Sequence, residues 1–118
     1  MKTLTLILAL FLAGTTYAQA PGEIVSFNAE KVNNAVVLTW SPSVSPETNH
    51  FEIQRSDDGI SWRVIALMFP YEDGSVSHMY EYSDKGISGS VHYRIRQIDI
   101  NKKENFSHVR TIGAPANK

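Results

Sequence analysis

The fold is decided by the stretch Val91-His92-Tyr93-Arg94-Ile95-Arg96-Gln97-Ile98, which alternates between two kinds of side chain. The apolar residues Val91, Tyr93 and Ile95 fall on one side of an extended chain, and the residues between them fall on the other. Such alternation is typical of a strand that buries one face and exposes the other to water. We therefore predict a half-buried β-strand over residues 91–98.

The rest of the chain contains further short runs of this kind. Each run is ended by turn residues such as Asp57-Asp58-Gly59 or by Pro42, and no segment after residue 20 has the helical period. Strands are predicted over residues 23–31, 35–41, 51–56, 61–69, 78–83, 91–98 and 105–112. Seven short strands with a turn after each indicate an all-β fold, a two-sheet immunoglobulin-like sandwich.

The N-terminal segment has the pattern of a signal peptide over residues 1–18. Lys2 gives a positive start, residues 4–13 are apolar, and small residues follow at Ala18 and Ala20. The apolar run is too short to cross a bilayer core of about 30 Å as a helix, so we predict no transmembrane span. We predict cleavage after Ala18 rather than after Ala20, because Pro21 would follow a bond cut at Ala20. After the signal peptide we predict a leader over 19–22, a domain over 23–112 and a tail over 113–118. We expect the protein to be exported to the periplasm or the cell surface.

Composition narrows the classes of function. The chain has 118 residues, no cysteine and a formal net charge of −1. Its length suits one domain. Without cysteine it has neither disulfides nor a thiol nucleophile, so its stability must come from a hydrophobic core. The near-neutral charge argues against a nucleic-acid partner.

Several motifs resemble those of known domains. Residues 36–40, Val-Val-Leu-Thr-Trp, resemble the second strand of fibronectin type III domains, whose tryptophan fills the core. Ile87-x-Gly89-x-x-x-Tyr93-x-Ile95 resembles the corner before their sixth strand, where the tyrosine hydroxyl bonds to upstream backbone. Residues 49–59, the motif Tyr80-x-Tyr82-x-Asp84 and residues 93–99 are similar to a fibronectin-like module of exported Bacteroidetes proteins. That module often precedes a sorting domain of the type 9 secretion route, and the resemblance implies a seven-stranded sandwich of the fibronectin type III kind.

A core follows from the alternation together with this resemblance. Trp62 is included because the similar modules bury an aromatic residue at its position. The predicted core consists of Leu38, Trp40, Phe51, Ile53, Trp62, Tyr82, Tyr93 and Ile95.

The connection Met68-Phe69-Pro70-Tyr71 is unusually apolar. An apolar loop is either tucked under the sandwich or used to bind a ligand, and the sequence leaves both open. If the loop is exposed, Phe69 and Tyr71 form a candidate binding contact for sugar rings.

A second candidate surface lies on the outward side of the strand over 91–98. It carries Arg94 and Arg96, and Glu52 and Gln54 should lie beside them on a neighbouring strand. Cross-strand pairs worth about 0.2–1 kcal/mol each would account for these residues, which is the interpretation that we favour. A partner-binding face is the alternative, because arginine is enriched at interface centres.

Metal and catalytic chemistry have weaker signals. His78, His92 and His108 lack the close spacing of zinc ligands, and the Asp-Gly pairs make turns for conformational reasons alone. No serine lies in a pattern that resembles a nucleophile elbow. We predict no catalytic residue, no metal site and no cofactor.

Two functions therefore remain as hypotheses. The first is a non-catalytic protein-interaction or adaptor domain of the cell envelope or surface, with another envelope or secreted protein as its partner. The alternative is a carbohydrate-binding accessory module that holds a glycan with Phe69 and Tyr71.

Overall fold

The computed structural model of the protein describes residues 24–42, 47–71 and 79–113. In these ranges the chain forms strands and no helix, so none of the described residues belongs to a helix able to cross a membrane. The predicted signal peptide, its cleavage site, the leader and residues 114–118 of the predicted tail lie outside the described residues.

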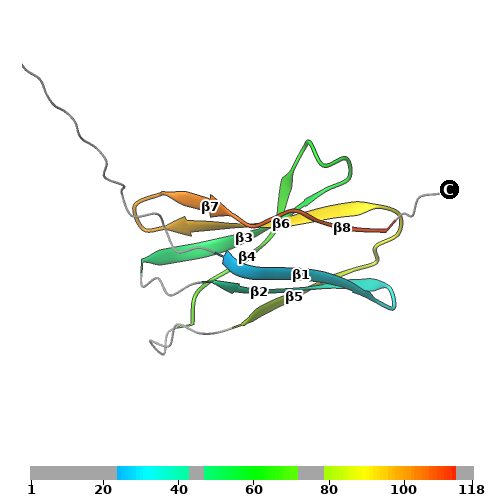
Figure 1. Cartoon of the computed structure of the whole chain (residues 1–118), viewed down its shortest axis with the longest axis horizontal. Coiled ribbons are helices and arrows are strands. Elements are labelled where there is room, and N and C mark those ends of the chain that lie inside the picture. Colours follow the sequence, from blue (N-terminus) through cyan, green and yellow to red (C-terminus); the bar gives the residue numbers. More distant parts are fainter. Residues whose placement is uncertain (1–23, 43–46, 72–78, 114–118) are drawn as a thin grey trace, which may run out of the picture.

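The strands form two antiparallel layers (Figure 1). One layer has three strands in the order β1-β2-β5, and the other has five, in which β4-β3-β6 is extended by β7 and β8 along the far side of β6. The bounds are β1 Ile24–Val32, β2 Ala35–Pro42, β3 Thr48–Ser56, β4 Arg63–Met68, β5 Tyr80–Lys85, β6 Val91–Asp99, β7 Glu104–Phe106 and β8 Arg110–Ile112. The predicted all-β, two-sheet arrangement is confirmed.

The predicted count of seven strands is wrong, because the last predicted strand, 105–112, is two strands. β7 pairs with the end of β6 and β8 with its start. Between them the Ser107 hydroxyl accepts a hydrogen bond from the Ile95 N–H at 2.8 Å and donates one to the His108 carbonyl at 2.8 Å. A side-chain oxygen thus takes the place of a backbone carbonyl in the ladder, which interrupts the strand.

The core lies between the two layers. Leu38, Trp40, Phe51, Ile53, Tyr93 and Ile95 are fully buried there, and the half-buried Tyr82 packs against them. The Trp40 ring stacks on Tyr80, with centroids 5.6 Å apart, and meets Phe51 edge-on at 5.9 Å. Offset and edge-on ring pairs of this kind add to the free energy of simple burial.

Trp62 is the correction to the predicted core. It lies in the turn before β4, and its ring sits 4.3 Å from the Arg94 guanidinium carbon instead of between the sheets. The reason is the path of the β3–β4 turn, which stands above the five-stranded layer in Figure 1. Trp62 on this turn contacts Arg94, an outward residue of β6, and so lies on the outer side of the sheet.

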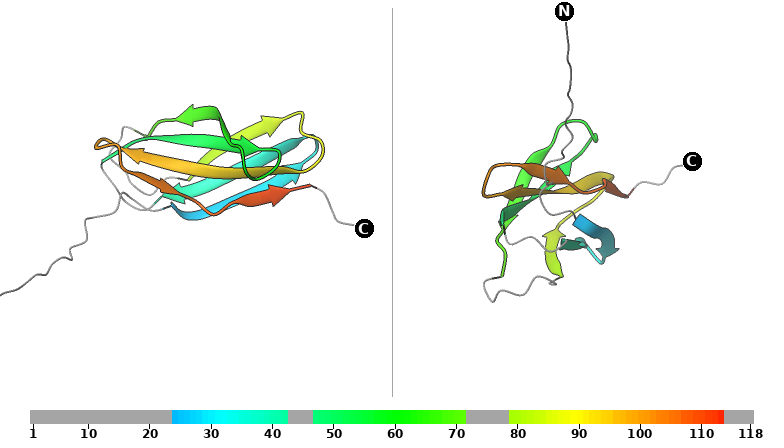
Figure 2. Two further views of the ribbon diagram at one scale, coloured as in Figure 1. Left: turned by 90° about the horizontal axis from the view of Figure 1, so that it is seen from above. Right: turned by 60° about the vertical axis from the view of Figure 1, so that its left-hand side comes forward.

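The two sides of the sandwich are closed differently. Figure 2 shows β1 and β8 side by side, where the Arg110 side chain donates to the Phe27 carbonyl at 2.8 Å. Toward the opposite side, the Arg55 guanidinium of β3 pairs with the Asp84 carboxylate of β5 at 2.7 Å. Each contact joins one sheet to the other.

The predicted partner of the Tyr93 hydroxyl, the upstream backbone, is wrong. This hydroxyl donates to the Asp84 carboxylate at 2.7 Å, and the expected bond to upstream backbone is replaced by this side-chain contact. Burial, followed by the bond to Asp84, raises the pKa of Tyr93 well above its usual value. The hydrogen bond to Asp84 also raises the pKa of Arg55, against the effect of burial. A buried polar cluster of three side chains therefore joins the sheets.

Candidate functional site

The outer face of the five-stranded sheet is made by alternate residues of β3, β6 and their neighbours. Across this face Gln54 is paired with Arg94, and Glu52 with Arg96. The outward residues nearer the two sides are Val64 and Leu67 on β4 and Glu104 and Phe106 on β7. The predicted neighbourhood of Arg94, Arg96, Glu52 and Gln54 is present.

Arg96 is held by two carboxylates. Its Nη1 lies 3.0 Å from Glu52 Oε2, and its Nε lies 2.6 Å from Glu104 Oε1. Burial pushes the pKa of Glu52 upward, but hydrogen bonds from Gln54 and Arg96 outweigh it and hold that pKa below its usual value. The Arg96 cation is therefore neutralised within the protein itself.

Arg94 is held by an amide and two aromatic rings. Its Nε donates to Gln54 Oε1 at 2.7 Å, and its guanidinium carbon lies 4.3 Å from the Trp62 ring centroid and 4.4 Å from that of Phe106. Burial, followed by repulsion from Arg96, lowers the pKa of Arg94. The cation thus contacts two rings, and each ring attracts it.

The turn that carries Trp62 is capped by its own side chains. Asp58 Oδ1 accepts hydrogen bonds from the backbone N–H groups of Ser61 at 2.9 Å and Ile60 at 2.8 Å, and from the Ser56 hydroxyl at 2.9 Å. These bonds lower the pKa of Asp58 to about 2. Gly59 has a φ of +79°, which glycine adopts without strain. The Asp58 carboxylate therefore stabilises the conformation of this turn through hydrogen bonds.

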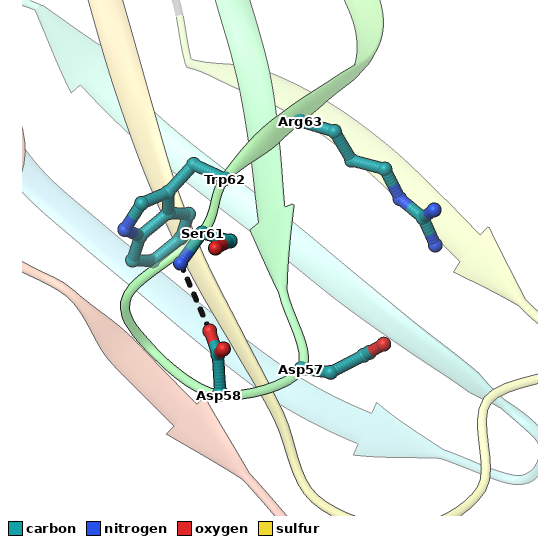
Figure 3. A pocket seen from close by; sticks show the side chains of 5 residues that line it. All are labelled: Asp57, Asp58, Ser61, Trp62 and Arg63. Atoms are coloured by element: carbon teal, nitrogen blue, oxygen red, sulfur yellow. Dashed lines mark hydrogen bonds between the residues drawn. The ribbon is translucent and has the colours of Figure 1, made fainter.

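An open hollow of about 210 Å³ lies beside this turn, lined by Asp57, Asp58, Ser61, Trp62 and Arg63. Figure 3 shows the Trp62 ring on one side of the turn, with the Asp57 and Arg63 side chains on the other. The dashed bond from Ser61 to Asp58 in that figure is the cap that holds the turn in this shape. Among the described residues no group of three histidine or acidic side chains is arranged to hold a metal ion.

Exposed apolar side chains gather on the outer face of the five-stranded sheet. Val64 is 48% exposed, Leu67 51% and Phe106 40%, and Phe69, 62% exposed, lies against His50 of β3 with ring centroids 5.9 Å apart. The outer face of the three-stranded sheet differs. Its outward residues are mainly polar, namely Asn28, Glu30, Thr39, Glu81, Ser83 and Lys85, and the apolar residues beside them are Val32, Ala35 and Val37.

The two candidate loop aromatics face different neighbours. Phe69 contacts β3, as described above, whereas the half-exposed Tyr71 stacks on Tyr80 of β5 at 4.9 Å. Tyr80 stacks in turn on Trp40, so Tyr71 continues a column of rings from the core to the surface. The loop thus combines the two possibilities: the Tyr71 ring packs partly against the sandwich, and the Phe69 ring is the more exposed of the two.

Sequence reasoning missed Trp62 and Phe106 as neighbours of Arg94. A signal for Phe106 was available, because its alternation with Asn105 places it on an outward position of a strand beside β6. Trp62 gave no such signal, since its place depends on how the turn folds over the sheet.

Comparison with known proteins gives similarity of fold alone. No family model matches the chain, and no curated protein matches it. Among solved structures, pectate lyase PelI of Erwinia chrysanthemi, in complex with tetragalacturonic acid, is similar with a TM-score of 0.59 and 14% identity over 78% of this chain. Pectate lyase Pel3 of Pectobacterium carotovorum has a TM-score of 0.58 and 17% identity over 83% of this chain.

A β-1,2-glucanase of Parabacteroides distasonis is also similar, with a TM-score of 0.54 and 17% identity over 83% of this chain. The chain spans only 28% of each of these two pectate lyases and 14% of the glucanase. The likeness therefore concerns a β-sandwich that forms part of larger proteins.

Proposed function

We propose that the chain is a non-catalytic recognition module that binds another protein through the outer face of its five-stranded sheet. The order of its strands, three in one layer and β4-β3-β6 with β7 and β8 in the other, supports a fibronectin type III-like assignment. The signal-like pattern of residues 1–18 supports export to the periplasm or the cell surface.

One observation carries this proposal, the gathering of Val64, Leu67, Phe69 and Phe106 on a single face. An exposed apolar patch costs free energy in water, and covering it with a partner recovers that free energy. On the opposite outer face, Val32 is the one large apolar side chain among the described residues that is exposed to a similar degree, so the exposed apolar surface is greater on the five-stranded sheet.

The centre of the same face is rigid. Arg94, Gln54, Glu52, Arg96 and Glu104 form one chain of hydrogen bonds and ion pairs across β3, β6 and β7. Side chains that are already ordered lose little entropy on binding, so a partner meets a prepared surface. Arginine and aromatic residues are enriched in protein interfaces, and this face presents Arg94 and Arg96 beside Trp62 and Phe106.

The test compares two valines on opposite faces. Val64 on β4 is 48% exposed and Val32 on β1 is 44% exposed, and both lie on outermost strands of their sheets. The protein and its Val64→Glu and Val32→Glu variants are used as bait for cross-linked envelope extract of the producing cell. We expect one dominant partner protein with the unaltered protein and with Val32→Glu, and its loss with Val64→Glu.

The control for folding is the thermal midpoint of each variant, which should stay within a few degrees of the parent because both positions are half-exposed. A partner retained equally by both variants would contradict the proposed face. A partner lost only with Val32→Glu would place the contact on the other sheet.

A carbohydrate-binding accessory module is the second candidate. It is favoured by the 62% exposure of Phe69, a ring free enough to meet a sugar, and by the similar fold within a pectate lyase and a β-1,2-glucanase. Tyr71 would be the second contact, although its stack on Tyr80 uses one of its ring faces.

Affinity electrophoresis in polysaccharide gels tests this candidate. Retardation that is lost in Phe69→Ala and kept in Val32→Ala would favour sugar binding. Retardation that survives Phe69→Ala and Tyr71→Ala would exclude these two rings as the contact, and no retardation by any gel would remove the candidate.

A further inference from the structure

Two arginines on the outer face of the five-stranded sheet differ in how their charge is met. Arg96 contacts the carboxylates of Glu52 and Glu104, at 3.0 Å and 2.6 Å. Arg94 contacts no carboxylate within residues 24–42, 47–71 and 79–113, and its partners there are Gln54 and two rings. Among the residues that the structure describes, Arg94 thus has no ion pair, and the attraction of Glu104 acts on it without direct contact.

The donors of Arg94 are also unequally used. Its Nε is bonded to Gln54, which is only 7% exposed and is itself held through its Nε2 by Glu52 at 2.9 Å. The two Nη groups make no hydrogen bond with any residue in the described ranges. These Nη atoms are not among the buried polar atoms without a partner, so their N–H donors remain for a ligand that approaches from solvent.

Carboxylate is the ligand that matches this arrangement. A planar guanidinium with free N–H donors binds a carboxylate through two parallel hydrogen bonds, which a rigid setting strengthens and orients. Burial and the neighbouring Arg96 cation disfavour the charged form of Arg94 more than the attraction of Glu104 favours it, so the pKa of Arg94 is lowered, and a bound anion would offset this effect.

We infer that Arg94, which contacts the rings of Trp62 and Phe106, binds an aspartate or glutamate side chain of the protein partner. The apolar side chains Val64 and Leu67 lie on the same face, on β4, beyond β3. We therefore expect the partner segment to have an acidic residue at one position and apolar residues beside it. This inference rests on the proposed function, because it names the chemistry of the segment that reaches the same face.

The rings favour a peptide over an acidic sugar. A pyranose binds an aromatic residue by stacking on its face, but Trp62 and Phe106 each turn a face to the guanidinium of Arg94. The contact that remains at Arg94 is with its charge and its N–H edge. A carboxylate at the end of a flexible side chain can reach that edge, whereas the carboxylate of a uronate is attached directly to a bulky ring that must be accommodated beside Trp62 and Phe106.

The experiment follows the Arg94 Nε–H and Trp62 indole N–H signals of the ¹⁵N-labelled protein by NMR. The probes are N-acetyl-Val-Glu-Val-amide, its glutamine analogue and tetragalacturonic acid. We expect saturable shifts of both signals with the glutamate peptide, at concentrations at least about ten-fold lower than any effect of the glutamine peptide. Arg94→Lys, which keeps the charge but not the planar fork, should weaken the glutamate response at least about ten-fold. Arg63→Lys, on the β3–β4 hairpin that carries Trp62, should leave it unchanged.

Several outcomes would overturn the inference. These are equal responses to the two peptides, an unweakened response in Arg94→Lys as followed by the Trp62 signal, or no saturable shift with peptide up to about 50 mM. A stronger response to tetragalacturonic acid than to the glutamate peptide would reject the peptide and identify an acidic sugar instead. Because this assay needs no natural partner, its failure is distinct from loss of partner capture, which alone bears on the proposed function.

Discussion

The interior between the sheets and the outer face of the five-stranded sheet each contain one tryptophan, and the two rings have different neighbours. Trp40 is fully buried and contacts the rings of Phe51 and Tyr80. Trp62 is half-buried and contacts a cation, Arg94. The first arrangement removes apolar surface from water, whereas the second fixes a charged group at the surface. The interior therefore contributes most of the stability of this sandwich, and the outer face is the surface that we propose meets the partner.

The largest effect should come from breaking the interior. Trp40→Ala should lower the free energy of unfolding by about 3–5 kcal/mol, because it removes a buried ring and leaves a cavity. The Trp40 indole N–H has no hydrogen-bond partner among the described residues, so Trp40→Phe loses ring area but no bond and should cost less. Urea unfolding followed by circular dichroism measures both changes. Equal and small losses in the two variants would contradict the central place of this ring.

The polar cluster between the sheets should come next. Asp84→Ala removes the carboxylate that joins Arg55 to Tyr93 and should cost about 2–3 kcal/mol, since it leaves a charged donor and a hydroxyl without their partner. Asp84→Asn keeps an acceptor for the Tyr93 hydroxyl and should cost less. Urea midpoints that are the same for the parent and Asp84→Ala would show that the cluster does not stabilise the fold.

The same cluster predicts a dependence on alkaline pH. The pKa of Tyr93 is raised in the folded protein, so the folded state holds this proton more tightly than the unfolded state. The contribution of Tyr93 to the free energy of unfolding is therefore fully present below the unfolded pKa of about 10. It falls as pH rises above that value, by up to about 1.4 kcal/mol per pH unit. Urea midpoints between pH 9 and 11 measure this slope, and Tyr93→Phe should flatten it. An unchanged slope in Tyr93→Phe would assign the effect to other groups.

The smallest effect on stability should come from the outer ring. Trp62→Ala should cost about 1 kcal/mol or less, because a partly exposed cation–π contact contributes about that much. The same change should move the NMR signal of Arg94 Nε–H, since the ring beside it is gone. If Trp62→Ala lowered the free energy of unfolding as much as Trp40→Ala does, Trp62 would be part of the core, and the difference between the two tryptophans would not exist.

The interior was largely predictable from the sequence, because alternation on strands specifies which side chains turn inward. Leu38 with Trp40 and Tyr93 with Ile95 are pairs two residues apart on single strands, so one hydrophobic face implies both members. The split of the last strand was not predictable in this way. It depends on one hydroxyl, that of Ser107, which replaces a backbone acceptor in the ladder.

The outer face was predictable only in part. Arg94 and Arg96 were placed beside Gln54 and Glu52 because neighbouring strands of this fold bring them together. The position of Trp62 depends on the turn that Asp58 caps, and such a path is set by local hydrogen bonds that no periodicity records. The unequal treatment of the two arginines was also hidden, since it depends on where Glu104 and Phe106 fall after β6 ends.

The most direct test of the account is photo-cross-linking within the producing cell, with a light-activated residue at Leu67 on the outer face of the five-stranded sheet or at Val32 on β1. Both positions are about half-exposed, so both probes reach solvent equally. We expect a discrete adduct with one protein from position 67 and none from position 32. An adduct from position 32 alone, or from neither position while a glycan is retained, would contradict recognition of a protein by this face.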